Sequence, residues 1–274
     1  MKKFLIKSLF VFALTLLVFS CDNSKIEDKS MSSDKHEGTH VKKQDCNDVH
    51  WSHHEGEEGP AHWKDLCDAF AACGGQAQSP INIVTNETSV GTNLNQIQIH
   101  YDSTPVDIIN NGHTVQFNVS GNNTITLGEK EYKLLQFHYH AASEHTINGN
   151  HYPIEVHFVN QYSDSDYSVV GAMFEEGTAN ELFTEYLAEF PESKGEYTSE
   201  NTIDLEKLLP SNLDYYYYIG SLTTPPCSEI VNWYVLKTPI KASKEQIEKF
   251  AGILHHNYRP VMPLNDRKVL SYNK

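Results

Sequence analysis

Two short segments, Gln136–His140 and Ile154–Val159, place three histidines where they could bind one metal ion. The first segment alternates apolar with polar residues and is rich in aromatic residues, which is typical of a β-strand. Side chains two apart on a strand share a face, so His138 and His140 point the same way. An Asn-Gly-Asn sequence between the segments predicts a turn. The second segment can therefore return as an antiparallel neighbour and bring His157 alongside.

Three neutral imidazoles with an open fourth position are typical of catalytic zinc, whereas structural zinc usually has four ligands rich in cysteine. A His-x-His pair alone is more often two half-buried histidines than a metal site, and it is the third histidine that favours Zn²⁺ at His138, His140 and His157. Gln136 and Glu155 each lie two residues before one of these ligands, on the same strand face. Each could accept a hydrogen bond from a ligand's other ring nitrogen and fix its tautomer.

Further motifs extend from Trp51 to Arg267, and with them the chain resembles an α-class carbonic anhydrase of the bacterial, exported lipoprotein type. The resemblance implies a mainly β (α+β) fold, with a large, mostly antiparallel central sheet and a few peripheral helices. It also implies the zinc-dependent, reversible hydration of carbon dioxide to bicarbonate and a proton, through a zinc-bound hydroxide. The motifs are His62-Trp63, Gln78-Ser79-Pro80-Ile81-Asn82-Ile83, Asn110-Asn111-Gly112-His113, Ser143-Glu144-His145, Gly220-Ser221-Leu222-Thr223-Thr224-Pro225-Pro226, Asn257-Tyr258-Arg259-Pro260 and Pro263-Leu264-Asn265.

The resemblance assigns catalytic roles to three residues. Thr223 is expected to accept a hydrogen bond from the hydroxide and donate one to Glu144, because an ionised carboxylate can only accept. His113 matches the proton shuttle, and imidazole takes up and releases protons near neutrality. A histidine after an Asn-Gly turn can also be an ordinary exposed loop residue. The family carries a tyrosine where this chain has His53, which we expect either to perturb proton transfer or to act as an auxiliary relay.

An apolar wall beside the hydroxide would suit carbon dioxide, which is small and nonpolar. For any one valine on a strand, ordinary core packing is the commoner role. By resemblance, the substrate pocket comprises Val159, Val169, Leu222, Thr224 and Trp233, with Val231 as a further candidate.

The amino-terminal region predicts export and lipidation. Residues 1–20 have three lysines before a short apolar run, which is typical of a signal peptide. Val18-Phe19-Ser20-Cys21 resembles a bacterial lipobox, so we expect lipidation of Cys21. Residues 21–45 are polar and predict a flexible tether, and residues 46–274 form the catalytic domain. The protein would then be anchored to a bacterial membrane, facing the periplasm or the cell exterior.

Four cysteines remain after Cys21. The resemblance implies a disulfide bond between Cys73 and Cys227, as in the family's exported members. Cys46 and Cys67 could pair with each other, or either could be free. Even numbers of cysteines are typical of exported proteins.

The net charge of the chain is −15, and removal of the three lysines of the signal peptide changes it to −18. Such acidity argues against nucleic acid as a partner and indicates that membrane attachment depends on the lipid. The expected small-molecule partners are carbon dioxide and bicarbonate, and the sequence does not identify a protein partner. Two alternatives are a non-catalytic zinc-binding module and a zinc esterase on the same fold.

The remaining patterns agree with a β-rich fold. Alternating or apolar runs predict further strands, and two segments predict helices, the second of which opens with a capping box. The predicted strands are Ile97–Tyr101, Thr114–Val119, Tyr167–Met173 and Ile230–Leu236, and the predicted helices run over Asn180–Phe190 and from Ser243 toward His255.

Overall fold

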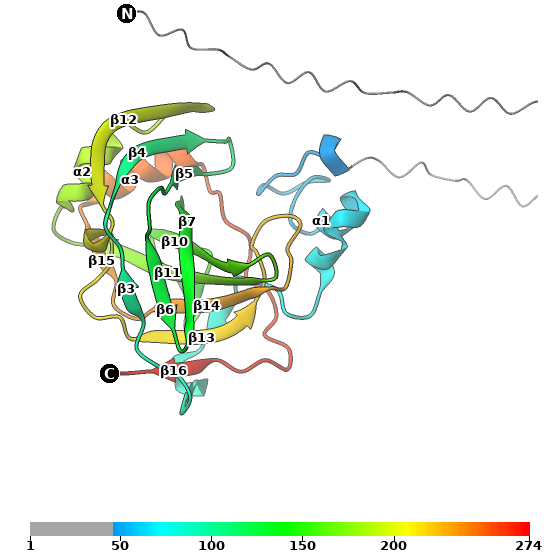
Figure 1. Ribbon diagram of the computed structural model, residues 1–274. Coiled ribbons are helices and arrows are strands. Elements are labelled where there is room, and N and C mark those ends of the chain that lie inside the picture. The colour runs from blue at the N-terminus through cyan, green and yellow to red at the C-terminus, as the bar shows by residue number, and fades with distance from the viewer. Residues whose placement is uncertain (1–45) are drawn as a thin grey trace, which may run out of the picture. The chain divides into compact units, whose positions relative to one another are not determined.

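The computed structural model describes residues 46–274 of the chain (Figure 1). The predicted signal peptide (1–20) and tether (21–45), with Cys21, lie outside the described residues. Within residues 46–274, no helix is both long enough and apolar enough to cross a membrane.

Helices are few and short. The α-helices are α1 (Trp63–Leu66), α2 (Glu181–Leu187) and α3 (Lys244–Leu254), and the 3₁₀ helices are η1 (Cys46–Asp48), η2 (Asp68–Gly74), η3 (Thr85–Glu87) and η4 (Glu206–Leu208). The strands are β1 (Asn82–Ile83), β2 (Ser89–Val90), β3 (Gln98–His100), β4 (Ser103–Asn110), β5 (Val115–Asn118), β6 (Thr124–Leu127), β7 (Lys130–His140), β8 (Thr146–Ile147), β9 (Asn150–His151), β10 (Ile154–Ser163), β11 (Asp166–Glu176), β12 (Gly195–Asp204), β13 (Tyr215–Gly220), β14 (Val231–Leu236), β15 (Ile240–Ala242) and β16 (Leu270–Tyr272).

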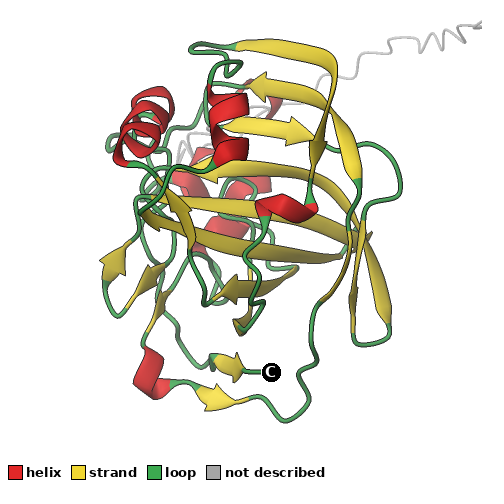
Figure 2. Cartoon of the chain, turned by 90° about the vertical axis from the view of Figure 1, so that its left-hand side faces the viewer, coloured by secondary structure: helices red, strands yellow, loops and turns green. Residues whose placement is uncertain are grey.

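A 13-stranded sheet dominates the described part of the chain, with the order β12-β4-β5-β7-β10-β11-β14-β13-β16-β2 and β3, β6 and β15 attached beside it (Figures 1 and 2). Most neighbouring strands are antiparallel, but β11 pairs in parallel with β14 and β15, and β16 pairs in parallel with β2. The prediction of a large, mostly antiparallel sheet with few helices is confirmed. α2 and α3 lie near β12 and β4, at the upper left of Figure 1. α1 lies at the right of the same view, away from these two strands.

The central strands β7 and β10 separate two apolar clusters. Because successive side chains alternate between the faces of a strand, Phe137 and Tyr139 of β7 point into the larger cluster, together with Phe158 of β10. Val159 of β10 belongs to the smaller cluster on the opposite face. That opposite face also carries the three candidate metal ligands.

The sequence located the main elements well. Each predicted strand overlaps an observed one, and the two predicted helices correspond to α2 and α3. At the start of α3, the Ser243 hydroxyl accepts a hydrogen bond from the backbone of Gln246, and the Gln246 side chain accepts one in return. The capping box is therefore confirmed. The predicted turn joins β8 to β9, where Asn148 and Gly149 both have positive φ.

Two disulfide bonds join the described cysteines. Cys73 pairs with Cys227, which lies 154 residues further along the chain. Cys46 pairs with Cys67, which decides between the alternatives that the sequence left open. The second bond closes a loop that contains Trp51 and His53, two residues that line the candidate site.

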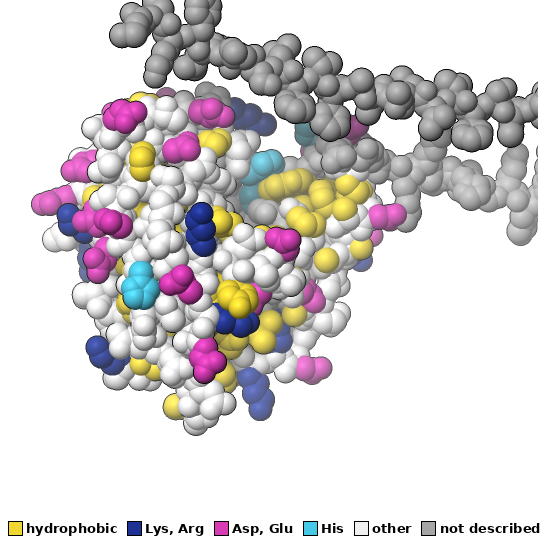
Figure 3. Space-filling view, in the orientation of Figure 1, with side chains coloured by type: hydrophobic (Ala, Val, Ile, Leu, Met, Phe, Trp, Pro, Cys, Tyr) yellow, Lys and Arg dark blue, Asp and Glu magenta, His cyan; other side chains and the backbone are white. Residues whose placement is uncertain are grey.

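Acidic side chains are spread over the face seen in Figure 3, with fewer lysines and arginines between them. This distribution agrees with the net charge of −15.

Candidate metal centre

The pairing of β7 with β10 brings the three histidines together. His157 lies directly opposite His138, and Glu155 lies opposite His140, in an antiparallel register. The ring centroids of His138 and His140 are 5.1 Å apart, and that of His157 is 5.3 and 4.6 Å from those two. One nitrogen from each ring lies within 4.8 Å of the other two. The three side chains can therefore reach a single ion.

Each ring is oriented by a hydrogen bond from its other nitrogen. His138 Nδ1 donates to Gln136 Oε1 (2.8 Å), and His157 Nε2 donates to Glu155 Oε1 (2.8 Å). His140 Nδ1 donates to the backbone oxygen of Asn257 (2.7 Å). These bonds fix the tautomers and leave Nε2 of His138, Nε2 of His140 and Nδ1 of His157 with lone pairs.

The Glu155 carboxylate accepts four hydrogen bonds in all. Its Oε1 also accepts a hydrogen bond from His145 Nδ1 (2.8 Å), and its Oε2 accepts the backbone N–H groups of Glu144 and His145 (both 2.9 Å). Gly171 faces this carboxylate, and a Cβ there would lie 2.9 Å from Oε1. Glycine on β11 therefore leaves the space that Glu155 occupies.

Although His145, Glu155 and His157 also cluster, their shared contacts are already hydrogen bonds. His145 Nε2 lies 2.7 Å from Tyr218 Oη, and Tyr218 Oη lies 2.8 Å from Ser79 Oγ. We therefore interpret this second cluster as the support of the first, because both nitrogens of His145, Nε2 of His157 and both oxygens of Glu155 already have hydrogen-bond partners.

Electrostatics keep the candidate ligands neutral. Burial lowers the pKa of His140 to about 4 and that of His138 well below its ordinary value, and neighbouring histidines lower the pKa of His138 further. The pKa of His157 is also lowered, mainly by burial, against the opposing effect of Glu155. Neutral imidazole is the form that binds a metal ion. Among residues 46–274, Nε2 of His140 is buried and has no hydrogen-bond partner, as expected for an atom that faces a metal. Three imidazole nitrogens suit zinc.

Glu144 lies at the edge of the candidate metal centre. Its Oε2 is 3.5 Å from Nε2 of His140 and 3.9 Å from Nδ1 of His157. Its Oε1 accepts the backbone N–H of Arg259 (2.8 Å). Burial raises the pKa of Glu144, against the opposing effects of His157 and Thr223. Thr223 thus lies close to this carboxyl, although Oε2 has no hydrogen-bond partner of good geometry among the described residues.

The loop that carries Thr223 is held on both sides. Before it, Ser221 exchanges hydrogen bonds with Ser79, with the Ser79 N–H donating to Ser221 Oγ (2.9 Å) and the Ser221 N–H donating to Ser79 Oγ (3.0 Å). After it, Cys227 is joined to Cys73. Thr223 itself is buried. The Cys73–Cys227 disulfide therefore anchors the chain directly after the loop that carries Thr223.

His113 sits in the tight connection between β4 and β5. The Asn111 side chain accepts its backbone N–H (2.8 Å), and the Asn257 side chain donates to its backbone oxygen (3.0 Å). The His113 imidazole stacks on the indole of Trp51, with centroids 3.9 Å apart and planes 13° apart. Burial lowers the pKa of His113, and Lys194 lowers it further.

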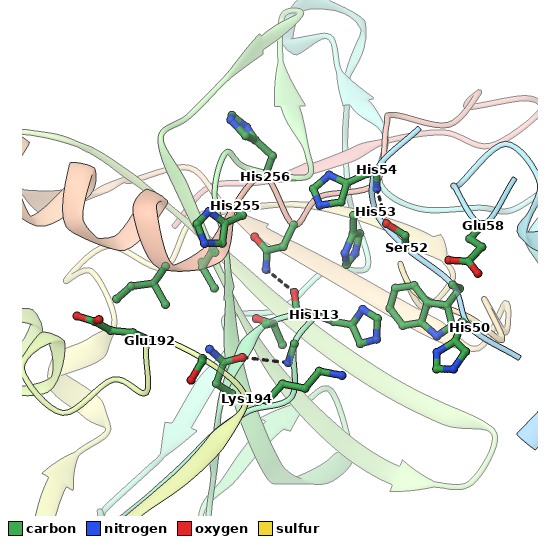
Figure 4. A pocket seen from close by; sticks show the side chains of 18 residues that line it. His50, Ser52, His53, His54, Glu58, His113, Glu192, Lys194, His255 and His256 are labelled. Carbon is green, nitrogen blue, oxygen red and sulfur yellow. Dashed lines mark hydrogen bonds between the residues drawn. The ribbon is translucent and has the colours of Figure 1, made fainter. Parts of the chain in front are cut away.

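Two cavities meet at His113. The inner one, about 150 Å³, contains the metal side of the site, and is lined by Trp51, His53, Asn111, His113, Thr114, Gln116, Gln136, His138, His140 and Thr224. The outer one, about 420 Å³, is rich in histidine (Figure 4), and includes His50, His54, His255 and His256 together with Glu192 and Lys194.

The predicted substrate wall is only partly at the cavity surface. Thr224 lines the inner cavity. Val159, Val169, Val231 and Trp233 are buried in the smaller apolar cluster, and Leu222 packs against it. The Trp233 ring lies 4.8 Å from the His157 ring, so this cluster adjoins the candidate metal centre.

Sequence reasoning missed three contributors to the site. Asn257 orients His140 through a backbone carbonyl, which any residue type could supply. Arg259 is buried, and its guanidinium donates to Gln78 Oε1 and to the backbone oxygens of Ser79 and Cys73 (2.8–3.1 Å). Its motif indicated family membership but no role. Trp51 marked only the start of the resemblance, and no local pattern predicted that its ring would stack on His113.

Comparisons with known proteins give a consistent result. The sequence profile of the family described as eukaryotic-type carbonic anhydrase matches residues 58–273. A carbonic anhydrase of Pectobacterium atrosepticum is 43% identical over 225 residues, which cover 81% of this chain and 91% of that protein. The Klebsiella pneumoniae carbonic anhydrase is 42% identical over 227 residues, which cover 81% of this chain and 90% of that protein.

Solved structures agree. The α-carbonic anhydrase of Thermovibrio ammonificans, in complex with the inhibitor sulfanilamide, superposes with a TM-score of 0.78 at 43% identity, covering 81% of this chain and 99% of that one. Dioscorin in complex with ascorbate superposes with a TM-score of 0.76 at 28% identity, covering 82% and 98%.

Proposed function

This chain belongs to the eukaryotic-type carbonic anhydrase family, and we propose that it carries out that family's reversible hydration of carbon dioxide with a zinc ion held by His138, His140 and His157. The observation that carries the proposal is the set of three lone-pair nitrogens within 4.8 Å of one another. Each belongs to a ring whose other nitrogen is already hydrogen-bonded.

A bound zinc ion would act as a Lewis acid that makes hydroxide available from water near neutral pH, an effect for which carbonic anhydrase is the standard example. Gln136, Glu155 and the carbonyl of Asn257 hold the three rings in place for it. Because these contacts are already made in the folded chain, little reorganisation is needed on binding.

Thr223 and Glu144 are proposed to orient the attacking oxygen. The Glu144 carboxyl is fixed through Oε1 by the backbone of Arg259, which leaves Oε2 on the side of the candidate ligands. An ionised Oε2 can only accept a hydrogen bond, so it would take the hydroxyl proton of Thr223. The Thr223 oxygen would then be left to accept a hydrogen bond from the attacking group.

His113 is proposed to carry the released proton to solvent. It lines both the inner and the outer cavity, so its imidazole is accessible from the metal side and from the outside. Its lowered pKa keeps the ring unprotonated and ready to accept a proton at neutral pH.

The apolar cluster beside His157 is proposed to form the substrate side of the site. Val159, Val169, Leu222 and Trp233 contribute no charge there, and Thr224 supplies a polar edge. A nonpolar substrate such as carbon dioxide needs no charged anchor.

The experiment that tests this function compares carbon dioxide hydration with ester hydrolysis in one preparation of residues 46–274. We expect hydration to be much the faster reaction, and His140→Ala to abolish it. His151→Ala changes a histidine outside the ligand set and serves as the control. Fast ester turnover with negligible hydration would favour an esterase, and zinc binding without either activity would favour a non-catalytic module.

We also propose that the protein is exported and anchored through a lipid on Cys21. The two disulfide bonds support export, because disulfides persist in oxidising compartments. In cells that express the full chain, we expect the protein in the membrane fraction. The Cys21→Ala variant should be recovered outside that fraction, and an unchanged distribution would contradict the proposal.

A further inference from the structure

Asn257 contacts two groups that have different proposed roles in the reaction. Its backbone oxygen accepts a hydrogen bond from Nδ1 of the candidate ligand His140 (2.7 Å). Its side-chain Nδ2 donates to the backbone oxygen of His113 (3.0 Å). The first contact uses only the main chain, whereas the second depends on the side-chain amide. A change of side chain can therefore separate the two.

The amide of Asn257 makes hydrogen bonds on both sides. Nδ2 also donates to the backbone oxygen of Tyr139 (2.9 Å), and Oδ1 accepts the N–H of Ala141 (3.0 Å). Carbonyl oxygens can only accept hydrogen bonds, so the NH₂ group must face the two of them, and this fixes the orientation of the amide. The amide thus joins residues 111–114, which we call the His113 turn, to the strand that carries two candidate ligands.

The amide lies where the pairing of β5 with β7 ends. The last pair in this register is Gln116 with His138. Beyond this pair, side chains connect the two backbones, because the Thr114 hydroxyl donates to the Tyr139 oxygen (2.6 Å) and the Asn257 amide donates to the same oxygen. A side-chain amide has the same donor and acceptor groups as a peptide bond. The amide of Asn257 therefore takes the place of a missing strand residue.

Asn257 reaches this position from the end of α3. The helix ends at Leu254, and the next two residues, His255 and His256, have positive φ values of 49° and 60°, which redirects the chain. These two histidines line the outer cavity (Figure 4), and Asn257 itself is buried. The amide therefore comes from a different part of the chain than the turn that it contacts.

Hydrogen bonds within the His113 turn fix its shape rather than its position. Asn111 Oδ1 accepts the backbone N–H groups of His113 and Thr114 (2.8 and 3.0 Å). The position of the turn relative to β7 depends on contacts with residues outside it, and the hydrogen bond from Asn257 reaches the backbone of His113 itself. Loss of the amide would let the turn move as a unit, together with the His113 imidazole.

We propose that Asn257 is a positioning residue for proton transfer, which acts through its side chain on His113. The amide holds the His113 turn against β7 and so sets the distance between the metal centre and the His113 imidazole. This inference rests on the proposed function, in which His113 carries the released proton. The distance matters because a displacement of about 1 Å can slow a reaction roughly 100-fold.

The test uses two variants of Asn257. Asn257→Ala removes the amide, and Asn257→Asp keeps its shape but replaces the donor Nδ2 with a carboxylate oxygen. Both retain the backbone oxygen that His140 uses. The matched control is Asn265→Asp, because Nδ2 of Asn265 also donates to a backbone oxygen, that of Gln76 (2.7 Å), at an exposed position. Each variant is made in the wild-type and in the His113→Ala background.

Three quantities are measured on each protein. Stopped-flow hydration at low buffer concentration gives kcat/KM, and kcat at its high-pH plateau, where a changed pKa of His113 has least effect. The ratio kcat/KM covers the steps up to bicarbonate, whereas kcat also includes removal of the proton. Zinc content is determined on the same sample. Hydrogen exchange of the backbone amides of residues 110–116, in the metal-free protein, reports on the His113 turn independently of activity.

We expect both Asn257 variants to lower kcat about 10-fold, which is part of the roughly 100-fold or more that a positioned proton-transfer group contributes. The ratio kcat/KM and the zinc content should stay the same, and amide exchange in the His113 turn should become faster. In the His113→Ala background, the same changes should lower kcat less than about 2-fold, because a residue that acts through His113 then has no effect to add. Asn265→Asp should match its parent in both backgrounds.

The proposal is overturned if the Asn257 variants lose kcat equally in both backgrounds, if kcat/KM falls with kcat, or if kcat stays at the wild-type value. Should Asn257→Ala fail to fold, as judged by circular dichroism, Asn257→Asp alone decides. An unchanged kcat in His113→Ala would show that the proposed proton carrier is wrong, and a wild-type protein with zinc but no hydration would refute the proposed function. Either of these two results would remove the basis of the inference as well.

Discussion

Oε1 of Glu155 lies 2.8 Å from Nε2 of His157, and the same oxygen lies 2.8 Å from Nδ1 of His145. One carboxylate thus orients a candidate metal ligand and connects it to the buried histidine behind it. Burial raises the pKa of Glu155, but the two histidines lower it more, so this pKa lies well below its ordinary value. The carboxylate is therefore ionised when the metal binds.

Glu155→Gln should weaken zinc binding roughly 10- to 100-fold, because the ligand loses the charged acceptor that fixes its tautomer. Competition with a chelator measures the dissociation constant. Glu131→Gln, on the exposed part of β7, should leave the constant unchanged. Equal affinity in Glu155→Gln and the wild type would show that the hydrogen bond has no role in holding the metal.

Thr223→Ala should lower kcat/KM for carbon dioxide by roughly 100-fold, at the lower end of what the loss of one oriented hydrogen-bonding group costs. Zinc content should stay the same, since Thr223 is not a ligand. Glu144→Ala should have an effect of the same order, because both residues are proposed to act as one unit. Thr198→Ala, on the exposed edge strand β12, is the control. Unchanged hydration in either site variant would disprove the proposed orientation of the attacking oxygen.

The pH dependence of kcat should report His113. Its pKa is lowered by burial, by Lys194 and by His50, so the ring stays able to accept a proton below its ordinary pKa of about 6.5. Lys194→Gln removes a positive charge and should raise that pKa, which moves the acidic limb of the kcat profile to higher pH.

The measurement is a kcat profile at low ionic strength, where charge effects are least screened. Lys207→Gln, whose lysine pairs with Asp204 on the surface, is expected to leave the limb in place. A shift of the limb to lower pH in Lys194→Gln would contradict the assignment of that limb to His113.

The two disulfides should differ in their effect on stability. By the chain-entropy relation, closing 154 residues stabilises by about 5 kcal/mol and closing 21 residues by about 3 kcal/mol. Cys73→Ser with Cys227→Ser should therefore cost more free energy of unfolding than Cys46→Ser with Cys67→Ser. Denaturant unfolding of both double variants measures the difference, and the reverse order would show that local packing decides the outcome.

The parts of the site that follow a short period could be predicted from the sequence. Strand alternation placed His138 and His140 on one face, and the two-residue spacing of Gln136 and Glu155 from their ligands indicated the hydrogen bonds that the structure contains. The direction of each ring was not predictable, because it depends on which nitrogen finds an acceptor.

Contacts between segments far apart in the chain could not be predicted, because they produce no periodic pattern in the sequence. The carbonyl of Asn257 reaches His140 across 117 residues, and backbone atoms carry no sequence signal. The pairing of Cys46 with Cys67 stayed open for a related reason, because spacing alone does not determine which cysteines meet. The stacking of Trp51 on His113 depends on how the amino-terminal loop folds back on the sheet.

The most direct test of the account is stopped-flow carbon dioxide hydration by residues 46–274, with zinc content determined on the same sample before and after chelation. We predict about one zinc ion per chain, since three histidines form one candidate site, with activity that disappears when zinc is removed and returns when zinc is added. Hydration that persists in the zinc-free protein, or stoichiometric zinc without hydration, would contradict the assignment of His138, His140 and His157 as the catalytic metal centre.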